Sequence, residues 1–487
     1  MPPGRRLAKW SLRLLGLLAA GCALIVLGFA ITTRATHPKL SAWHRLRLHE
    51  EFHADRADIK SFEDYRRLED RLFAELRTRL LDNPQATDSF ALGRYHPGSV
   101  PEQLALDTRY NRSYELVPAN PRGAVLLVHG LSDSPYSLRA IAQTFYSQGY
   151  DVVVLRLPGH GTIPAGLLDV DWRDWYSAVT LAAKYAAARA GPGRPFLAGG
   201  HSTGAALLTL YSVRALEDTT LPRPQRLYLT SPAIGLSDFA ALSNIVSALS
   251  FLPFFEQSAW ADVVPEYDPY KYNSFPVNAG KQIYRLTRQL QRELKSAGDR
   301  GHLGDMPRVT VFQSIVDATV KTTDIVQGFL ALLPPRGHEL VVFDVNRIDI
   351  LQGLIAQAPI ESLQRIRDAR DLPFRVTLIA NRAPGSREVA AYVREAGGQE
   401  LTVRPLSLEW PPGVVSLGHV AIPFPIDDPV YGLTPGPGEG PVYPLGSFAA
   451  RGEPGALVVP LDKLARLRCN PFFDVIRAKI VESLPPD

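Results

Sequence analysis

The sequence predicts an α/β fold in which a mostly parallel, doubly wound sheet is covered by helices. Three apolar runs, at residues 124–128, 151–155 and 195–199, have the composition of strands that are buried on both faces. Each run ends in a short loop that contains glycine and histidine, and each loop leads toward a segment of helical character. This alternation is typical of a parallel sheet whose polar loops gather at the carboxyl ends of the strands.

The remaining elements follow from the same patterns of apolar residues. Strands are expected at 112–117, 225–230, 308–313, 340–343, 374–380 and 401–406, and helices at 136–147, 171–188, 348–366, 387–396 and 471–484. The stretch of about 348–404 is interpreted as an extra α/β unit inserted at the edge of the sheet. The stretch 431–455, rich in proline and glycine, is interpreted as a surface loop.

The composition sets limits on what the chain can be. Its 487 residues are 46% hydrophobic and 21% charged, which is enough apolar material for one large domain or two medium ones. The net charge of +4, without any long run of Lys and Arg, gives no support to nucleic-acid binding. Cys22 and Cys469 have neither metal-site spacing nor a setting that favours a disulfide. Because no metal-site spacing of Cys or His occurs, we predict no metal ion. Because no Gly-rich phosphate loop of the Walker or dinucleotide type occurs, we predict no cofactor.

An uncharged apolar run at 14–31 is close to the length that crosses a bilayer. The basic residues before this run outnumber those just after it, and this asymmetry keeps the N-terminus in the cytoplasm. We therefore predict that residues 1–35 form a cytoplasmic tip and a transmembrane signal anchor. The chain would be a single-pass membrane protein whose main domain lies on the exported side, periplasmic or extracellular.

Two other interpretations of this N-terminus stay open. A cleaved signal peptide is disfavoured because the apolar run is long and Ala-x-Ala cleavage signals are poor. Residues 18–22 resemble the lipobox of lipoproteins, with Cys22 as the lipidated residue. Against lipidation, residues 23–27 remain apolar, whereas the sequence after such a cysteine usually turns polar.

Residues 36–110 are predicted to form a helical stalk and a connector. Apolar residues recur there at spacings of three and four, which indicates an amphipathic helix. These residues are Phe62, Tyr65, Leu68, Leu72, Leu76 and Leu80. The helix either packs on the main domain or is a solvated charged spacer, and the spacer is the favoured interpretation. Residues 84–110, which contain several prolines, are expected to be an irregular connector.

Residues 200–204, Gly-His-Ser-Thr-Gly, form the pattern G-x-S-x-G between an apolar strand and a helical segment. In that context the pattern is typical of a nucleophilic serine on a sharp turn, here Ser202. The turn holds the serine in a strained conformation, and the glycines remove bulk where strand and helix pass close together. For the motif alone, a Gly-rich loop without a catalytic role is the alternative.

Two further motifs follow predicted strands, His129-Gly130 and the Pro-Gly-His-Gly sequence of 158–161. In this order, and together with 200–204, they resemble the α/β-hydrolase superfamily, most closely its branch of monoacylglycerol lipases, lysophospholipases and serine aminopeptidases. The resemblance covers about 112–330 and 405–480. It implies an α/β-hydrolase fold over 111–487, with a helical lid at about 232–305. The aromatic and apolar composition of that lid suits an acyl chain, and it equally suits packing onto the sheet.

The resemblance also implies an acid and a histidine that follow the serine along the chain. Asp317 stands just after a predicted strand, in the place where the family presents its aspartate, while Asp344 and Asp324 are weaker candidates. His419, in a loop before an apolar segment, is expected to be the general base. The other downstream histidine, His338, is expected in a turn that faces solvent.

For the oxyanion of a tetrahedral intermediate, the resemblance implies two donors, the backbone N–H groups of Leu131 and Thr203. Three other histidines occur in the motifs. His129 and His160 are expected to orient loops, and His201 is expected to pack beneath the turn.

The sequence thus predicts a serine hydrolase that cleaves a small-molecule or lipid-like carboxylic ester through an acyl-enzyme on Ser202. An aminopeptidase-like amide hydrolase is the alternative within enzymes, and it needs an acidic pocket for a substrate amine. Glu256, Asp262 and Glu266 in the lid are weak candidates for that pocket. Acyl transfer to an acceptor other than water, and a non-catalytic receptor or scaffold on the same fold, also remain open.

Overall fold

The computed structural model describes residue 21 and residues 38–107, 109–235, 253–348, 353–369, 371–448, 457–459 and 461–486. Within these ranges, no helix is both long and apolar enough to cross a membrane. The predicted anchor at 14–31 lies, apart from Gly21, outside the described residues, and so does Cys22.

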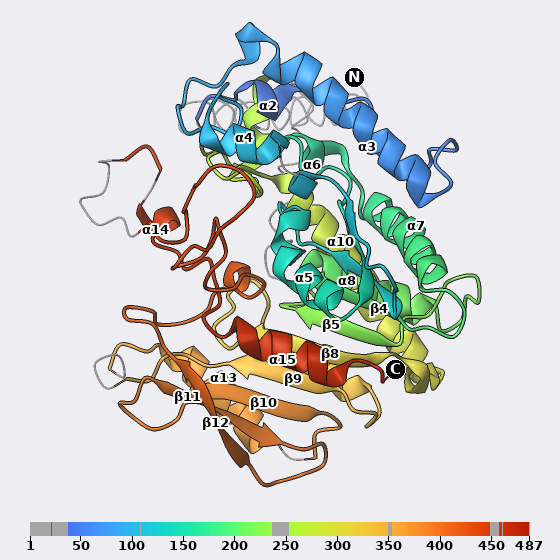
Figure 1. Ribbon diagram of the computed structural model, residues 1–487, viewed down its shortest axis with the longest axis vertical. Coiled ribbons are helices and arrows are strands. Elements are labelled where there is room, and N and C mark those ends of the chain that lie inside the picture. Colours follow the sequence, from blue (N-terminus) through green and yellow to red (C-terminus); the bar gives the residue numbers. More distant parts are fainter. Residues whose placement is uncertain are drawn as a thin grey trace, which may run out of the picture.

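A ten-stranded sheet forms the centre of the molecule (Figure 1). Its strands, in sheet order, are β1 (Tyr114–Leu116), β3 (Tyr150–Leu155), β2 (Gly123–Val128), β4 (Phe196–His201), β5 (Arg226–Thr230), β8 (Arg308–Ser314), β9 (Glu339–Phe343), β10 (Arg375–Asn381), β11 (Glu388–Arg394) and β12 (Thr402–Glu409). Neighbours from β3 to β10 run parallel, whereas β1, β11 and β12 are antiparallel to theirs. The predicted doubly wound, mostly parallel sheet is confirmed.

Helices cover both faces of the sheet and create two apolar layers. On one face lie α7 (Trp172–Ala190), α8 (Thr203–Arg214) and α10 (Val277–Asp299), and on the other lie α5 (Arg139–Ser147) and α15 (Phe473–Ser483). Successive residues of a strand pack into opposite layers. Leu126 packs in the layer of α7, α8 and α10, while Val125 and Leu127 pack in the layer of α5 and α15. This division explains why the strands are continuous apolar runs without polar alternation.

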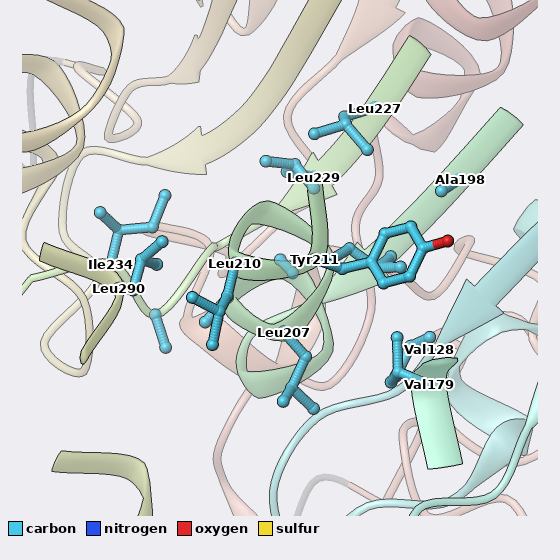
Figure 2. Packing of buried hydrophobic residues seen from close by; sticks show 14 of the residues in the cluster. Val128, Val179, Ala198, Leu207, Leu210, Tyr211, Leu227, Leu229, Ile234 and Leu290 are labelled. Atoms are coloured by element: carbon cyan, nitrogen blue, oxygen red, sulfur yellow. The ribbon is translucent and has the colours of Figure 1, made fainter. Parts of the chain in front are cut away.

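The helix α8 is buried along nearly its whole length, which fixes the start of the helix relative to the sheet. Figure 2 shows Leu207, Leu210 and Tyr211 leaving this helix in different directions, among side chains from β4, β5, α7 and α10. A helix that is apolar on all sides is stable only when it is enclosed. Because α8 begins directly after Ser202, its packing holds that serine in place.

The insertion after β9 differs from the predicted α/β unit. The helix α13 (Gln357–Asp368) and the strands β10 and β12 match expected elements in type, but residues 387–396, expected to be helical, form β11 instead. Hydrogen bonding to β10 on one side and β12 on the other overrides the local helical tendency of this segment. The sheet is therefore extended by one parallel strand and an antiparallel pair.

Residues 38–107 form a layer on the main domain and not a solvated spacer, so the favoured interpretation of this segment is wrong. Within this layer, helix α3 (Phe62–Leu76) buries Phe62, Tyr65 and Leu68 in the same core as α7. Further along the chain, Leu76 packs with Trp260, which comes from the segment after β5. The recurrent apolar positions of the sequence are thus the face that α3 packs against the domain.

A buried ion cluster joins this N-terminal layer to the sheet. Arg156, fully buried just after β3, donates from Nε to Glu69 Oε1 at 2.7 Å and from Nη2 to Glu51 Oε1 at 3.1 Å. Ser113 Oγ donates to Glu69 Oε1 at 3.0 Å, and Tyr65 donates to the carbonyl of Arg156 at 2.8 Å. Each charge has an opposite partner and further hydrogen bonds, as a buried charge requires.

Of the predicted lid at 232–305, residues 232–235 and 253–305 are described. Its second half is α10, which packs its apolar face onto α8 and so belongs to the helical layer of the sheet. Between residue 253 and α10, Trp260 and Tyr272 are buried, and the Tyr272 hydroxyl donates to the carbonyl of Gly159 at 3.1 Å. These aromatic residues pack the segment onto the domain.

We expect Glu69→Ala to lower the free energy of unfolding by about 3–5 kcal/mol, because it removes one partner of a buried ion pair and leaves the Arg156 Nε–H and the Ser113 hydroxyl without their acceptor. Urea unfolding followed by tryptophan fluorescence measures the change. The matched control is Glu63→Ala on the exposed face of the same helix, where the loss should stay below about 1 kcal/mol. Equal losses in the two variants would contradict the role assigned to the cluster.

Candidate active site

Ser202 stands on a sharp turn between β4 and α8, as the G-x-S-x-G pattern predicts. Its backbone angles are φ 51° and ψ −112°, outside the regions that a serine adopts without strain. The turn is held by hydrogen bonds from the Ser202 N–H to the Thr230 carbonyl at 2.9 Å and from the Ala233 N–H to the Ser202 carbonyl at 3.1 Å. The Ser202 side chain is 7% exposed, so the turn presents it at the edge of the buried interior.

The two glycines of the motif allow close packing of the backbone. A Cβ at Gly204 would overlap the carbonyl oxygen of Val128 at the end of β2. A Cβ at Gly200 would lie 2.7 Å from the backbone nitrogen of Ala205. Both positions therefore exclude any side chain, which is the reason for glycine that the sequence suggested.

The loop after β2 lies against the turn at Ser202. A Cβ at Gly130 would lie 3.2 Å from Ser202 Cβ and 3.1 Å from His201 Cδ2. Leu131 follows in this loop, and Thr203 is the first residue of α8. In the part of the chain that is described, neither backbone N–H of these two residues donates a hydrogen bond. Both N–H groups therefore belong to segments that lie against the Ser202 turn, as an oxyanion site there would require.

Asp317 and His419, which are 102 residues apart in sequence, meet in the structure. Nδ1–H of His419 donates to Asp317 Oδ2 at 2.8 Å, and the Asp317 and His419 residues are 6% and 8% exposed. The other carboxylate oxygen, Oδ1, accepts the backbone N–H groups of Thr319 and Val320 at 2.8 and 2.9 Å. The carboxylate is therefore fixed in orientation and sets the tautomer of the histidine ring.

The electrostatics around this pair keep Asp317 ionised. Burial alone would raise the pKa of Asp317, but the charge of His419 and the hydrogen bonds from His419, Val320 and Thr319 hold that pKa below its ordinary value. The ring of His419 lies 5.0 Å from that of His201, the residue before Ser202. The histidine is thus next to the aspartate and to the residue that precedes Ser202.

The other motif histidines have structural partners. His129 donates from Nδ1 to the Gly130 carbonyl at 2.8 Å, and its Nε2 accepts the N–H of Leu157 at 3.0 Å, so it links the loops after β2 and β3. Burial lowers the pKa of His129 to about 3, so the ring is neutral. His201 donates from Nδ1 to the Thr230 hydroxyl at 3.1 Å. These contacts agree with orienting and packing roles.

The weaker candidates lie elsewhere. Asp344 forms a bidentate ion pair with Arg347, at 2.7 and 3.0 Å, and Asp324 belongs to α11 (Thr322–Gly328) and lies beside Gly235. His338, expected to face solvent, is only 1% exposed because its Nδ1 accepts the N–H of Val309 at 3.1 Å. That expectation is wrong, and the histidine is part of the core between β8 and β9.

Two basic residues near the site had no signal in the sequence. Lys271 Nζ pairs with Asp133 at 2.8 Å, two residues beyond Leu131, and lies 5.2 Å from the ring centroid of Phe424. Arg466 lies close to His419, since a Cβ at Gly418 would be 3.9 Å from its Nε and Nη2. Both residues come from distant parts of the chain, so only the fold brings them to this place.

Across the described ranges, no group of three His, Cys, Asp or Glu residues is placed to hold a metal ion. A cavity of about 370 Å³ lies between Tyr136, Tyr270 and the loop 435–442, and neither Ser202 nor His419 lines it.

Comparison with known proteins agrees with this geometry. The sequence profile of the family described as serine aminopeptidase, S33, matches residues 119–329. A thermostable monoacylglycerol lipase of Bacillus sp. (strain H-257) is 40% identical over 55 residues, which make up 11% of this chain and 22% of that enzyme. The chain therefore matches about a fifth of the length of this curated relative.

Solved structures show weaker likeness. One of the metagenome-derived lipolytic enzymes LipS and LipT has a TM-score of 0.38 at 22% identity, over 53% of this chain and 98% of that chain. The monoacylglycerol lipase of Paleococcus ferrophilus has a TM-score of 0.36 at 14% identity, over 47% and 87%. Superpositions this weak add no argument, so the assignment depends on the sequence match. The matched residues 119–329 include the strand, turn and helix that present Ser202, and over this range the chain resembles the α/β-hydrolase branch of serine aminopeptidases and monoacylglycerol lipases.

Proposed function

We propose that this protein is a serine hydrolase that cleaves a carboxylic ester, with Ser202 as nucleophile, His419 as general base and Asp317 as the acid of a catalytic triad. The observation that supports it most is the 2.8 Å hydrogen bond between His419 and Asp317, beside a serine held at a positive φ angle. A nucleophile, a base and a group that orients the base form the minimum set for acyl transfer through serine.

In the proposed acylation, Ser202 Oγ attacks the ester carbonyl carbon while His419 Nε2 accepts the hydroxyl proton. Asp317 holds the imidazole in the tautomer that leaves Nε2 free, and it stabilises the imidazolium that forms. The N–H groups of Leu131 and Thr203 donate hydrogen bonds to the carbonyl oxygen, which becomes negatively charged. His419 then returns the proton to the leaving alcohol, and the acyl group stays on Ser202.

Deacylation repeats the cycle with water in place of serine. His419 removes a proton from the water, whose oxygen attacks the acyl carbon, and then protonates Ser202 as the carboxylic acid leaves. Transfer of the acyl group to another acceptor uses the same residues, so acyl transfer remains the alternative within this chemistry.

Ester substrates are favoured over peptides with a free amine because no acidic pocket is available from the candidate residues. Glu256 pairs with Arg45 at 3.4 Å, and Asp262 pairs with Lys463 at 3.3 Å. Glu266 is fully buried and accepts the backbone N–H groups of Asn273 and Ser274, both at 2.8 Å. Arg466, close to Gly418 and hence to His419, would also repel an ammonium group.

A membrane location is part of the proposal and depends on the sequence alone. The apolar run at 14–31, with basic residues before it, would anchor the chain and place the hydrolase domain on the exported side. The apolar stretch of the insertion at 232–305 would then cover an acyl chain of a lipid-like ester. A cleaved or lipidated N-terminus would change the anchoring but not the chemistry.

Labelling with a fluorophosphonate probe tests the nucleophile. We expect the detergent-solubilised wild-type protein to react, and Ser202→Ala and His419→Ala to lose labelling, with the rate of ester hydrolysis reduced roughly 10⁴–10⁶-fold. Asp317→Asn should reduce the rate roughly 10⁴-fold, because the histidine then takes the wrong tautomer.

The matched control is Ser212→Ala, which removes another buried serine hydroxyl from the same helix, one that donates to the Leu208 carbonyl. Its labelling and hydrolysis should stay near those of the wild type. A folded wild-type protein that does not react would refute the proposed chemistry and leave a receptor or scaffold as the leading function.

The buried position of Glu266 predicts a pH dependence of stability. Burial raises the pKa of Glu266 from 4.5 to about 7, so between these pH values the folded state keeps a proton that the unfolded chain has lost. The free energy of unfolding should therefore fall as the pH rises through this window, by up to about 3 kcal/mol. Urea unfolding from pH 4.5 to pH 7.5 should show this fall in the wild type and a flatter profile in Glu266→Gln. Parallel profiles would show that Glu266 is ionised in the folded state and available to a cation.

A further inference from the structure

A long insertion separates β9 from the loop that bears His419. After β9 the chain passes Asp344, forms α13 and the three edge strands β10, β11 and β12, and reaches the loop before His419 at about residue 414. Despite this detour, the returning loop lies at the carboxyl ends of β8 and β9, next to Asp317. Something must therefore bring the loop back to a defined position over those strand ends.

Three hydrogen bonds hold the returning loop at the strand ends. The backbone N–H of Asn346 donates to the Val415 carbonyl at 2.8 Å, and its side-chain Nδ2 donates to the Val414 carbonyl at 2.9 Å. Ser314, the last residue of β8, donates from Oγ to the Leu417 carbonyl at 2.6 Å. The carbonyl at Leu417 is two residues before the histidine, so these bonds set the start of the His419 turn.

The last residue of the inserted strand β10 orients the side chain of Asn346, which is one of these donors. Asn381, its last residue, donates from Nδ2 to Asn346 Oδ1 at 3.0 Å and accepts the Arg347 N–H on Oδ1 at 2.8 Å. Asn346 and Asn381 are 2% and 8% exposed. Buried amides of this kind have one low-energy arrangement, because any other leaves a donor or acceptor unpaired.

We propose that Asn346 and Asn381 are positioning residues for His419, and that the insertion thereby helps to set the geometry of the active site. Asn381 fixes the amide of Asn346, and that amide holds the loop whose histidine donates to Asp317. The inference rests on the proposed function for its catalytic consequence. A displacement of about 1 Å in a catalytic group costs roughly 10²-fold in rate, so loss of these hydrogen bonds should lower kcat.

A merely structural role for the two amides makes a different prediction. It would lower stability and reduce the amount of folded enzyme, but each folded molecule would keep its turnover number and its substrate affinity. The positioning role predicts a loss in kcat with KM nearly unchanged, since neither amide touches the serine or the aspartate in the described contacts.

The test compares Asn346→Ala and Asn381→Ala with Thr377→Val in the full-length protein. Thr377 is buried on the same strand as Asn381, and its hydroxyl donates to Glu339 at 2.6 Å, away from the histidine loop. We expect kcat for an ester and the second-order rate of fluorophosphonate labelling to fall 10- to 100-fold in both asparagine variants, with KM within about twofold. Thr377→Val should keep the wild-type kcat, even if its thermal unfolding midpoint falls as much as in the asparagine variants.

Hydrogen–deuterium exchange supplies a readout that needs no activity. Peptides covering 414–421 should exchange at least tenfold faster in the asparagine variants than in the wild type or in Thr377→Val. In the double variant, the loss of kcat should be no larger than in Asn346→Ala alone, because both residues act through one set of hydrogen bonds. Unchanged exchange at 414–421, or a wild-type kcat in Asn381→Ala, overturns the proposal. An unreactive wild type with faster exchange in the variants would instead refute the ester chemistry and leave the positioning of the loop established.

Discussion

The close approach of Gly204 to the end of β2 is the constraint on which the rest of the site depends. With no side chain at this position, the first turn of α8 reaches the carbonyl of Val128, and the loop after β2 can pass over Ser202 at Gly130. One contact between backbones thereby sets both the strained serine and the two unused N–H donors beside it. A side chain at Gly204 would move helix and loop apart, and so would separate Ser202 and Thr203, at the start of α8, from Leu131 in the loop.

The strands and the residues of the site could be predicted because their signals are local. A strand buried on both faces is a continuous apolar run, and the turn at Ser202 needs glycines at fixed offsets. The order of serine, acid and base along the chain then limited the choice to few residues. The 2.8 Å contact between His419 and Asp317 itself had no local signal, since 102 residues separate the two side chains.

The predictions that were wrong concern segments whose structure is decided by partners distant in sequence. Residues 388–394 contain alanine, arginine and glutamate, which suit a helix, but two neighbouring strands offer hydrogen bonds that only an extended chain can use. His338 looked polar enough for a surface turn, yet the N–H of Val309 gave its ring a buried partner. The charged segment around α3 looked solvated because Arg156, the buried partner of Glu51 and Glu69, stands far along the chain.

That same ion cluster imposes an order of events during synthesis. Glu69 and Glu51 precede Arg156 by 87 and 105 residues, so a ribosome adding about 5–20 residues per second exposes the carboxylates for roughly 5–20 s before their partner emerges. Throughout that interval the apolar face of α3 has no sheet to cover it. The N-terminal layer is thus made before the parts of the domain on which it docks. A chaperone that binds nascent apolar helices would act at this stage, well before the turn at Ser202 exists.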